Sequence, residues 1–359
     1  MWSPMLLRLP IIGAPMAGGP STPQLAAAVS NAGGLGMLAA GYRTADALAA
    51  DIAAVRSQTD SPFGVNLFVP ASANLAEGLG GQVVSANDAG ARAVAVERYA
   101  RQLSDVEGIA RDQLGAVNAA DDDGWNEKLE LLIQTPVAVV TFTFGVPAPE
   151  VIARFRRVGT AIGVTVTDER EAVRAEVAGT SFLIVQGAEA GGHRGTHRVN
   201  DEPNDRETVE LVAAIRGTTD LPLVAAGGIV DEHDAEAAMS AGASAVQIGT
   251  ALLLADEAGT NPVHRAALRD PAFTATAITR AYSGRPARTL TTQFAQRHPD
   301  APAAYPEVNQ LTGPIRQAAK ATGDPHRLHL WAGTGWQRAT GGTAGQIAHR
   351  IAGRFTRDG

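Results

Sequence analysis

The sequence contains no cysteine and almost no lysine, and both absences exclude chemistry. Without cysteine, the 359 residues can form no disulfide framework, thiolate metal site or cysteine nucleophile. The only lysines are Lys128 and Lys320. Schiff-base chemistry requires a lysine at the end of a strand. Neither lysine lies at one, which argues against an aldolase of this kind.

Long apolar runs and an excess of basic residues are also missing. No stretch approaches the roughly 18 apolar residues of a membrane span, and the N-terminal residues lack the pattern of a signal peptide. The net charge of −7 argues against nucleic acids and membrane surfaces as partners, because basic patches usually bind both. We therefore expect a cytoplasmic globular protein, whose oligomeric state the sequence does not reveal.

Eight short apolar runs, each bounded by glycine, proline or polar residues, predict eight strands. Most runs are continuously hydrophobic, which is typical of parallel strands buried on both faces. The predicted strands are Leu9–Pro15, Gly34–Ala39, Phe63–Phe68, Val137–Phe144, Ala161–Thr167, Phe182–Gly187, Pro222–Gly228 and Ala245–Thr250.

Helical patterns alternate with these strands. They cover Thr22–Asn31, Thr44–Arg56, Pro149–Arg157, Asp168–Ala178 and Asp231–Ala241. Asp231 is expected to cap the last of these helices and Gly242 to end it. The alternation predicts an α/β fold, a (β/α)8 TIM barrel. An open doubly wound sheet also fits, because a sequence does not show whether a sheet closes.

Residues 69–136 exceed what a minimal barrel needs. Apolar residues recur there at helical spacing from Trp125 to Ile133, and Asp122 or Asp123 is the expected cap of this helix. The stretch Ala91–Leu103 also has a helical pattern. We expect residues 1–68 and 137–254 to form the barrel and residues 69–136 to form a helical insertion that includes one barrel helix.

Residues 255–359 form a long tail beyond the last strand. It contains a predicted helix at Pro262–Arg269, an alternating run at Phe273–Tyr282 and a final helix with Ile347, Ile351 and Phe355. We expect this tail to be a cap or substrate region, which could cover one barrel mouth together with the insertion.

The loops after the last two predicted strands are rich in glycine. Gly227 and Gly228 end the seventh strand, and the run Gln247, Ile248, Gly249, Thr250 ends the eighth. TIM barrels usually bind phosphate groups at this place, because glycine lets the backbone approach the ligand closely. The alternative is that these glycines only form tight turns.

The loop after the sixth strand contains a histidine between glycines, in the run Gln186–Gly195 (QGAEAGGHRG). Imidazole titrates near neutral pH, so His193 at a strand end is a candidate proton acceptor. A loop histidine that only bonds the backbone is the alternative. A metal site with His197 is disfavoured, because two histidines four residues apart suit a helix and this stretch is too rich in glycine.

Three further segments have two interpretations each. Asn66 in the third strand could bond a cofactor or tie two strands together, since a buried amide needs partners. Tyr305 could line a pocket or pack in the core. The segment Trp331–Trp336 (WAGTGW) could approach a cofactor or form a glycine turn between two buried tryptophans.

Taken in order, these motifs resemble the nitronate monooxygenase family, formerly called 2-nitropropane dioxygenases. The tail segment Tyr305–Arg316 (YPEVNQLTGPIR) resembles the family too. The matching stretches in the barrel are Pro10–Gly19 (PIIGAPMAGG), Gly64–Phe68 (GVNLF), Gln186–Gly195, Val224–Ile229 (VAAGGI) and Gln247–Thr250 (QIGT).

The resemblance implies non-covalent FMN on a TIM barrel and oxidation of nitronates, the anions of nitroalkanes, by O2 to carbonyl compounds and nitrite. It assigns the catalytic base to His193. It places the flavin contacts at Asn66, Gln186, Gly191, Gly228 and Gln247–Thr250, and the glycine pattern adds Gly227.

Two other functions remain open at this point. FMN-dependent NAD(P)H:quinone reductases and enoyl reductases resemble the same motifs but require a nicotinamide donor. A barrel that only binds a flavin or phosphate would explain the glycines but not His193. Chemistry like that of IMP dehydrogenase is excluded because it needs a cysteine.

Overall fold

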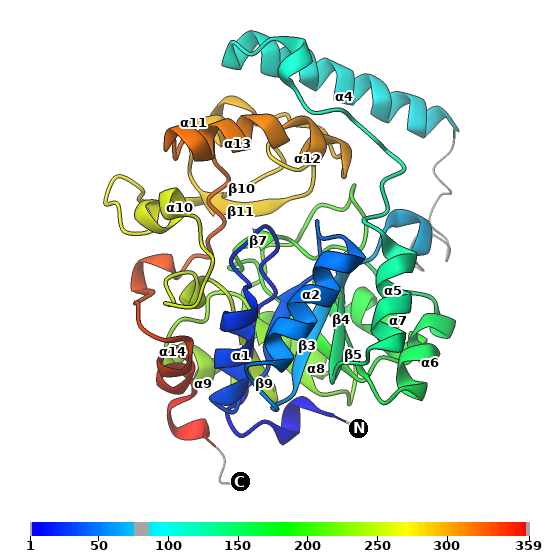
Figure 1. The fold of residues 1–359 in the computed structure, drawn as a ribbon, viewed down its shortest axis with the longest axis vertical. Helices are drawn as coiled ribbons and strands as arrows, with labels where there is room; N and C mark the ends of the chain where they lie inside the picture. The colour runs from blue at the N-terminus through cyan, green and yellow to red at the C-terminus, as the bar shows by residue number, and fades with distance from the viewer. Residues whose placement is uncertain (1, 75–85, 357–359) are drawn as a thin grey trace.

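A barrel of eight parallel strands forms the centre of the computed structural model, which describes residues 2–74 and 86–356 (Figure 1). The strand order is β1-β9-β8-β6-β5-β4-β3-β2. Gly13 N donates to Leu35 O and Leu35 N donates to Ile11 O, both at 2.9 Å, and these bonds join the first strand to the second. The predicted TIM barrel is confirmed. Its strands are β1 Ile11–Gly13, β2 Gly36–Ala39, β3 Phe63–Phe68, β4 Val139–Thr143, β5 Ala161–Val166, β6 Phe182–Gln186, β8 Leu223–Ala226 and β9 Ala245–Ile248.

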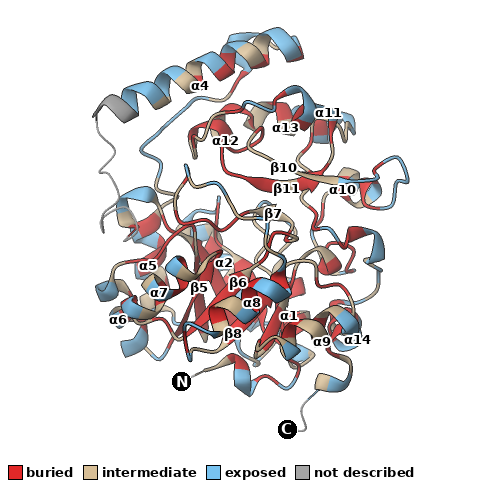
Figure 2. Ribbon diagram, turned by 180° about the vertical axis from the view of Figure 1, so that it is seen from behind, coloured by how far each residue is buried: buried red, intermediate tan, exposed pale blue. Residues whose placement is uncertain are grey.

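Helices surround the barrel (Figures 1 and 2). They are α1 Pro23–Asn31, α2 Ala45–Arg56, α5 Trp125–Gln134, α6 Pro149–Arg157, α7 Glu169–Ala178, α8 Thr208–Arg216 and α9 Glu232–Ser240. Thr22, Thr44, Asp168 and Asp231 each accept a hydrogen bond from the backbone N–H three residues later, which fixes where four of these helices begin. Gly242, with a φ of +110°, follows the end of α9.

The start of α5 differs from the expectation. Its N-cap is Gly124, which has a left-handed conformation with a φ of 63° and offers no side chain. The predicted cap at Asp122 or Asp123 is therefore wrong. The Asp123 carboxylate instead lies 2.8 Å from Lys128 Nζ, and Asp122 Oδ1 accepts a hydrogen bond from Gly124 N. Both aspartates thus stabilise the turn that precedes the helix.

Side chains are buried on both faces of the barrel strands. In β6, for example, Leu183 packs outward with the helices, whereas Phe182 and Ile184 pack inside the barrel. Neighbouring residues of a strand point to opposite faces. Burial on both faces explains why the predicted strands are continuously hydrophobic and do not alternate.

A second group of elements lies above the mouth of the barrel (Figures 1 and 2) and is called the cap below. Its hydrophobic core joins residues of the insertion, such as Tyr99 and Leu103, to residues of the tail, such as Tyr282, Phe294 and Leu311. The cap elements are α4 Ala86–Glu107, β10 Thr276–Thr279, β11 Ala287–Leu290, α11 Gln293–Arg297, α12 Glu307–Leu311 and α13 Gly313–Thr322. Insertion and tail therefore form one packed unit.

Two further connections link the tail to the barrel. The short strand β7 (Gly192–His193), in the loop after β6, pairs antiparallel with β11 of the cap. The final helix α14 (Ala344–Ala352) returns to the barrel and packs against α1 and α9. Helix α10 (Pro262–Ala267) precedes the cap strands. None of the described helices is long and apolar enough to cross a membrane.

Candidate active site

Four neighbouring strands bring most of the predicted site residues to one side of the barrel mouth. Ile12 of β1 pairs with Gln247 of β9, Gln247 pairs with Ala226 of β8, and Ala226 pairs with Gln186 of β6. The loops that follow Ala226, Gln186 and Gln247 are consequently neighbours in space. Asn66 lies on β3, on the other side of β1 and β2.

The glycines after β8 adopt backbone conformations that favour glycine. Gly227 has a φ of +124° and Gly228 a φ of +71°. A Cβ at Gly227 would lie 2.7 Å from Thr208 Oγ1 and 3.0 Å from Ala190 N. The tight-turn interpretation therefore accounts for Gly227, and its role in phosphate binding stays a prediction.

One potential anion site in this region is already filled by the protein itself. The first N–H of α8 and the hydroxyl of the same residue, Thr208, both donate to Glu189 Oε2 at 2.6 Å. A carboxylate thus occupies the start of this helix, where a phosphate would otherwise be stabilised. A cofactor phosphate would have to use the backbone around Gly228 and Gly249.

Gln247 has an unsatisfied polar atom at the predicted cofactor position. Its Oε1 is buried and has no hydrogen-bond partner among the described residues. Leaving such an acceptor without a donor costs about 1–3 kcal/mol. A flavin offers donors of the required kind, a ring N–H and ribityl hydroxyls. The adjacent Ile248 is buried and can offer only its backbone, so Gln247 is the residue of this strand whose side chain fits a flavin.

Asn66 ties two barrel strands together. It is buried, and its Nδ2 donates to Thr141 Oγ1 and Thr143 Oγ1 of β4, both at 3.0 Å. The strand-tying interpretation of Asn66 is therefore correct for its amide nitrogen. A contact between Asn66 and a flavin stays a prediction.

The Gln186 side chain holds the loop that carries the histidine. Its Nε2 donates to His193 O at 3.0 Å, and its Oε1 accepts from Gly195 N at 2.7 Å. One bond is made to His193 itself and the other to Gly195, two residues later. Together they fix the histidine backbone relative to the end of β6. Gln186 is thus placed to position His193.

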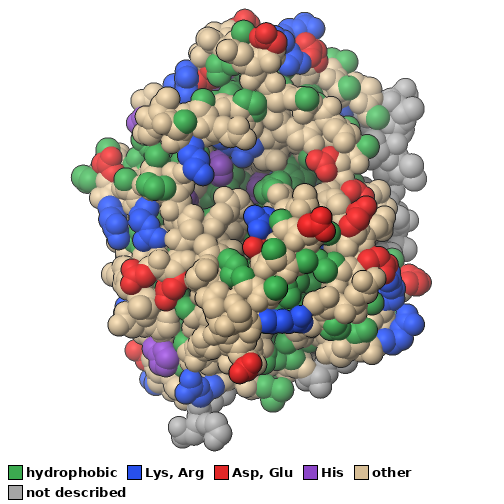
Figure 3. All heavy atoms as spheres, in the orientation of Figure 1, with side chains coloured by type: hydrophobic (Ala, Val, Ile, Leu, Met, Phe, Trp, Pro, Cys, Tyr) green, Lys and Arg blue, Asp and Glu red, His purple; other side chains and the backbone are tan. Residues whose placement is uncertain are grey.

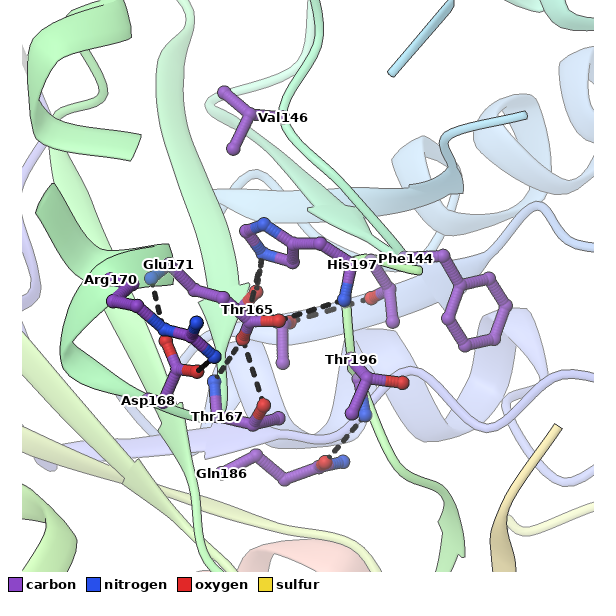
Figure 4. Close-up of polar contacts among 12 residues, drawn as sticks. Phe144, Val146, Thr165, Thr167, Asp168, Arg170, Glu171, Gln186, Thr196 and His197 are labelled. Carbon is purple, nitrogen blue, oxygen red and sulfur yellow. Dashed lines mark hydrogen bonds and ion pairs between the residues drawn. The ribbon is translucent and has the colours of Figure 1, made fainter. Parts of the chain in front are cut away.

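A buried carboxylate holds the far end of the same loop (Figure 4). Glu171 of α7 accepts hydrogen bonds from His197 N at 2.8 Å and from Thr167 N at 2.6 Å. The His197 ring points to β5, where Nε2 lies 3.0 Å from Thr165 O. His197 therefore stabilises the loop, and it does not share a ligand set with His193. The described residues contain no group of three or more potential metal ligands.

His193 itself lies among aromatic rings at the boundary between barrel and cap. Its Nε2 is 2.8 Å from Ser283 Oγ. The ring centroids of Trp331, Phe144 and Tyr305 are 5.4, 5.6 and 6.2 Å away. Burial, together with two nearby arginines, lowers the pKa of His193 to about 3. The imidazole is therefore neutral at physiological pH.

The cavity around His193 also contains residues that strand-end motifs alone could not identify. Tyr42 and Phe144 follow β2 and β4 and have φ values of 66° and 75°, which are strained for side chains of this size. The Arg285 guanidinium lies 4.0 Å from the centroid of the Phe144 ring and 5.4 Å from that of Tyr305. Tyr305 donates to the Tyr42 hydroxyl at 3.3 Å. Tyr305 therefore lines this cavity, as one of its two interpretations predicted.

The segment Trp331–Trp336 lies directly on the ends of the barrel strands. Gly333 N donates to Thr250 Oγ1 at 2.9 Å, and Thr334 N donates to Glu189 O at 3.0 Å. Gly191 lies so close that a Cβ there would be 2.5 Å from Gly333 N. Trp336 is buried in a hydrophobic cluster, so the segment is both a turn and part of the mouth.

The cavity opens between the cap and the barrel. The space-filling view shows a hollow there, in which histidine and basic side chains are visible (Figure 3). A small cavity of about 50 Å³ is lined in part by Tyr42, Phe68 and Tyr305. Phe68 packs on Phe144 with ring centroids 4.7 Å apart, which links this cavity to the surroundings of His193.

A closed (β/α)8 barrel with glycine-rich loops after its last strands and a histidine at its mouth is typical of TIM-barrel enzymes that bind a phosphate-bearing ligand. Residues 3–352 match the model of the nitronate monooxygenase family. The chain belongs to this family, and it is a flavin-dependent oxidoreductase.

Similar proteins cover nearly the whole chain. A probable nitronate monooxygenase of Staphylococcus haemolyticus is 34% identical over 96% of this chain and 93% of its own length. The solved structure of nitroalkane oxidase from Streptomyces ansochromogenes is 45% identical, covers 97% of this chain and 96% of its own, and has a TM-score of 0.86. FabK from Thermotoga maritima is more distant, at 27% identity, coverage of 98% and 94%, and a TM-score of 0.72.

Proposed function

We propose that the protein binds FMN and oxidises alkyl nitronates with O2 to carbonyl compounds and nitrite, and that it also accepts neutral nitroalkanes after removing a proton. The observation that carries this proposal is the half-buried His193, which lies among the rings of Trp331, Phe144 and Tyr305 at the mouth of a flavin-type barrel. The names of the Staphylococcus and Streptomyces relatives support the same substrate class.

The residues proposed to hold FMN come from both sides of the mouth. Gln247 would accept a hydrogen bond at its unsatisfied Oε1, and the backbone of the glycine-rich loops would hold the phosphate. The full set is Asn66, Gln186, Gly191, Gly227, Gly228, Gln247, Ile248, Gly249 and Thr250. Bound FMN would supply the redox chemistry, the transfer of electrons from the nitronate to O2.

His193 would act on neutral nitroalkanes by accepting the proton from the carbon that carries the nitro group. Its low pKa keeps the ring unprotonated at neutral pH, and the negative charge that forms on the bound nitronate would raise the pKa as the proton is transferred. Arg285 and Arg316, which lower that pKa, would stabilise the nitronate anion that forms. A substrate that is already a nitronate needs no such step, so it depends less on His193.

The test is to purify the protein, record its visible spectrum and follow O2 uptake with propionate 3-nitronate and with nitroethane. His193→Asn should reduce kcat/KM for nitroethane by roughly 100-fold or more, within the range for loss of a general base. The same variant should affect the nitronate much less. His233→Asn is a suitable control because His233 is exposed on α9.

Three results would contradict the proposal. Equal loss of both activities in His193→Asn would remove the base role. Rapid reduction by NADH or NADPH without nitronate turnover would favour a nicotinamide-dependent reductase. A colourless protein that cannot take up FMN would remove the proposed cofactor.

A further inference from the structure

Arg316 brings a positive charge from the cap to the mouth of the barrel without a negative partner. It lies on α13, and its Nη2 donates to Asn309 Oδ1 at 3.0 Å. Its Nε is buried and has no hydrogen-bond partner among the described residues. Asn309 lines the small cavity together with Tyr42 and Tyr305, and the ring centroid of Tyr305 lies 6.2 Å from that of His193. Arg316 is therefore held at the edge of the His193 surroundings, and its charge contributes to lowering the pKa of His193.

Three other arginines of the cap are paired with carboxylates. Arg92 contacts Glu307, and Arg297 and Arg327 both contact Glu107. The partner of Arg316 is instead a neutral asparagine, and no carboxylate of the described chain lies within ion-pair distance of it. The charge of Arg316 is therefore not neutralised by the protein.

A second cation lies in the same cavity. Arg285 is buried beside Phe144, which in turn contacts His193 with ring centroids 5.6 Å apart. Burial and Tyr42 together raise the pKa of Tyr305 far above its usual value, so its hydroxyl stays neutral. Arg285 Nη1 also donates to Thr196 O at 3.0 Å. Two guanidinium groups thus lie in the largely aromatic surroundings of His193, and that of Arg316 is the main candidate for binding an anion.

Keeping a cation in such surroundings is costly unless an anion joins it. The planar guanidinium group can form two parallel N–H···O bonds. It therefore suits anions in which two oxygens are bonded to the same trigonal planar atom. We infer that Arg316, assisted by Arg285, forms a binding subsite for a planar oxyanion beside His193. Within the proposed function, on which this assignment of the ligand rests, the oxyanion is the NO2⁻ end of the nitronate.

Nitrate is the probe that tests the subsite without any reaction, because it is a planar oxyanion of similar shape that cannot be turned over in this way. Isothermal titration of the holoprotein with nitrate should show binding at one site. Arg316→Gln should weaken it about 10- to 100-fold, as expected for loss of a charge-assisted hydrogen bond. Arg316→Lys should recover part of the affinity. Arg101→Gln, an exposed arginine on α4, should bind like the wild type.

Asn309→Asp gives a second variant in which the arginine remains in place. The aspartate has the shape of the asparagine but would neutralise Arg316 through the contact that already exists. It should therefore weaken nitrate binding by a similar factor. This variant keeps the test decisive if Arg316→Gln does not fold, which melting temperature and flavin content will show.

Steady-state kinetics with the nitronate test whether the same subsite binds the substrate. Arg316→Gln should raise KM for the nitronate about tenfold or more and change kcat less, and nitrate should compete with the nitronate in the wild type. Nitrate affinities within twofold of the wild type in both variants would overturn the inference, even if nitronates are oxidised. Normal nitrate binding through Arg316 without any nitronate oxidation would instead overturn the proposed function and leave the anion subsite standing.

Discussion

Replacing Gly333 with alanine tests whether the tail segment Trp331–Trp336 completes the cofactor site. A Cβ at this position would lie 2.6 Å from Glu189 O, 3.1 Å from Gly191 N and 3.3 Å from Thr250 Oγ1. The first contact is with backbone and is shorter than real Cβ contacts allow. The segment must therefore move away from the ends of β6 and β9.

The size of the effect follows from the contacts that this movement breaks. Two hydrogen bonds, from Gly333 N to Thr250 Oγ1 and from Thr334 N to Glu189 O, would be lost or lengthened. At about 1 kcal/mol each, together with an overpacking cost of about 1–3 kcal/mol, the total is roughly 3–5 kcal/mol. If the whole protein is strained, the free energy of unfolding falls by this amount. If only the segment detaches, the loss appears as weaker FMN binding.

Urea unfolding of the protein and FMN retention during gel filtration distinguish these two outcomes. Gly345→Ala is the matched control, since the new Cβ would make only an ordinary contact at 3.5 Å with Ala32, and alanine favours the helix by about 0.5–1 kcal/mol. A Gly333→Ala protein with wild-type stability and wild-type FMN retention would refute the close packing of this segment on the strand ends.

Two further predictions concern stability. Glu107 is buried and contacts the guanidinium groups of Arg297 and Arg327 and the imidazole of His298. Glu107→Gln should therefore reduce the free energy of urea unfolding by roughly 3–5 kcal/mol. A loss below 1 kcal/mol would contradict a central role for this carboxylate in the cap. The pKa of His193, lowered to about 3, lies below that of an unfolded histidine near 6.5. The unfolded chain therefore binds the proton more tightly than the folded protein. The contribution of neutral His193 to the free energy of unfolding is complete above pH 6.5 and is lost as the pH falls from 6.5 towards 3. His193→Asn should flatten the pH dependence of unfolding in this window, and an unchanged slope would contradict the low pKa.

Much of the barrel can be read from the sequence, because its determinants are local. Burial on both faces makes each strand a continuous apolar run, and capping residues such as Thr44 and Asp168 mark where helices begin. In a parallel barrel every strand ends at the same mouth. The sequence positions of Gln186 and Gln247 near the ends of their strands therefore placed both residues at the mouth.

The residues that surround His193 depend on contacts between distant parts of the chain. Arg285 and Arg316 come from the tail, about 90 or more positions after His193, and reach it only because β11 pairs with β7 and the cap has its own core. Loops also carry no periodic pattern, so the strained backbones of Tyr42 and Phe144 leave no signal in the sequence. Local burial and capping thus determined the scaffold, whereas the charge and shape of the cavity were decided by tertiary packing, because that packing alone brings barrel loops and cap side chains together.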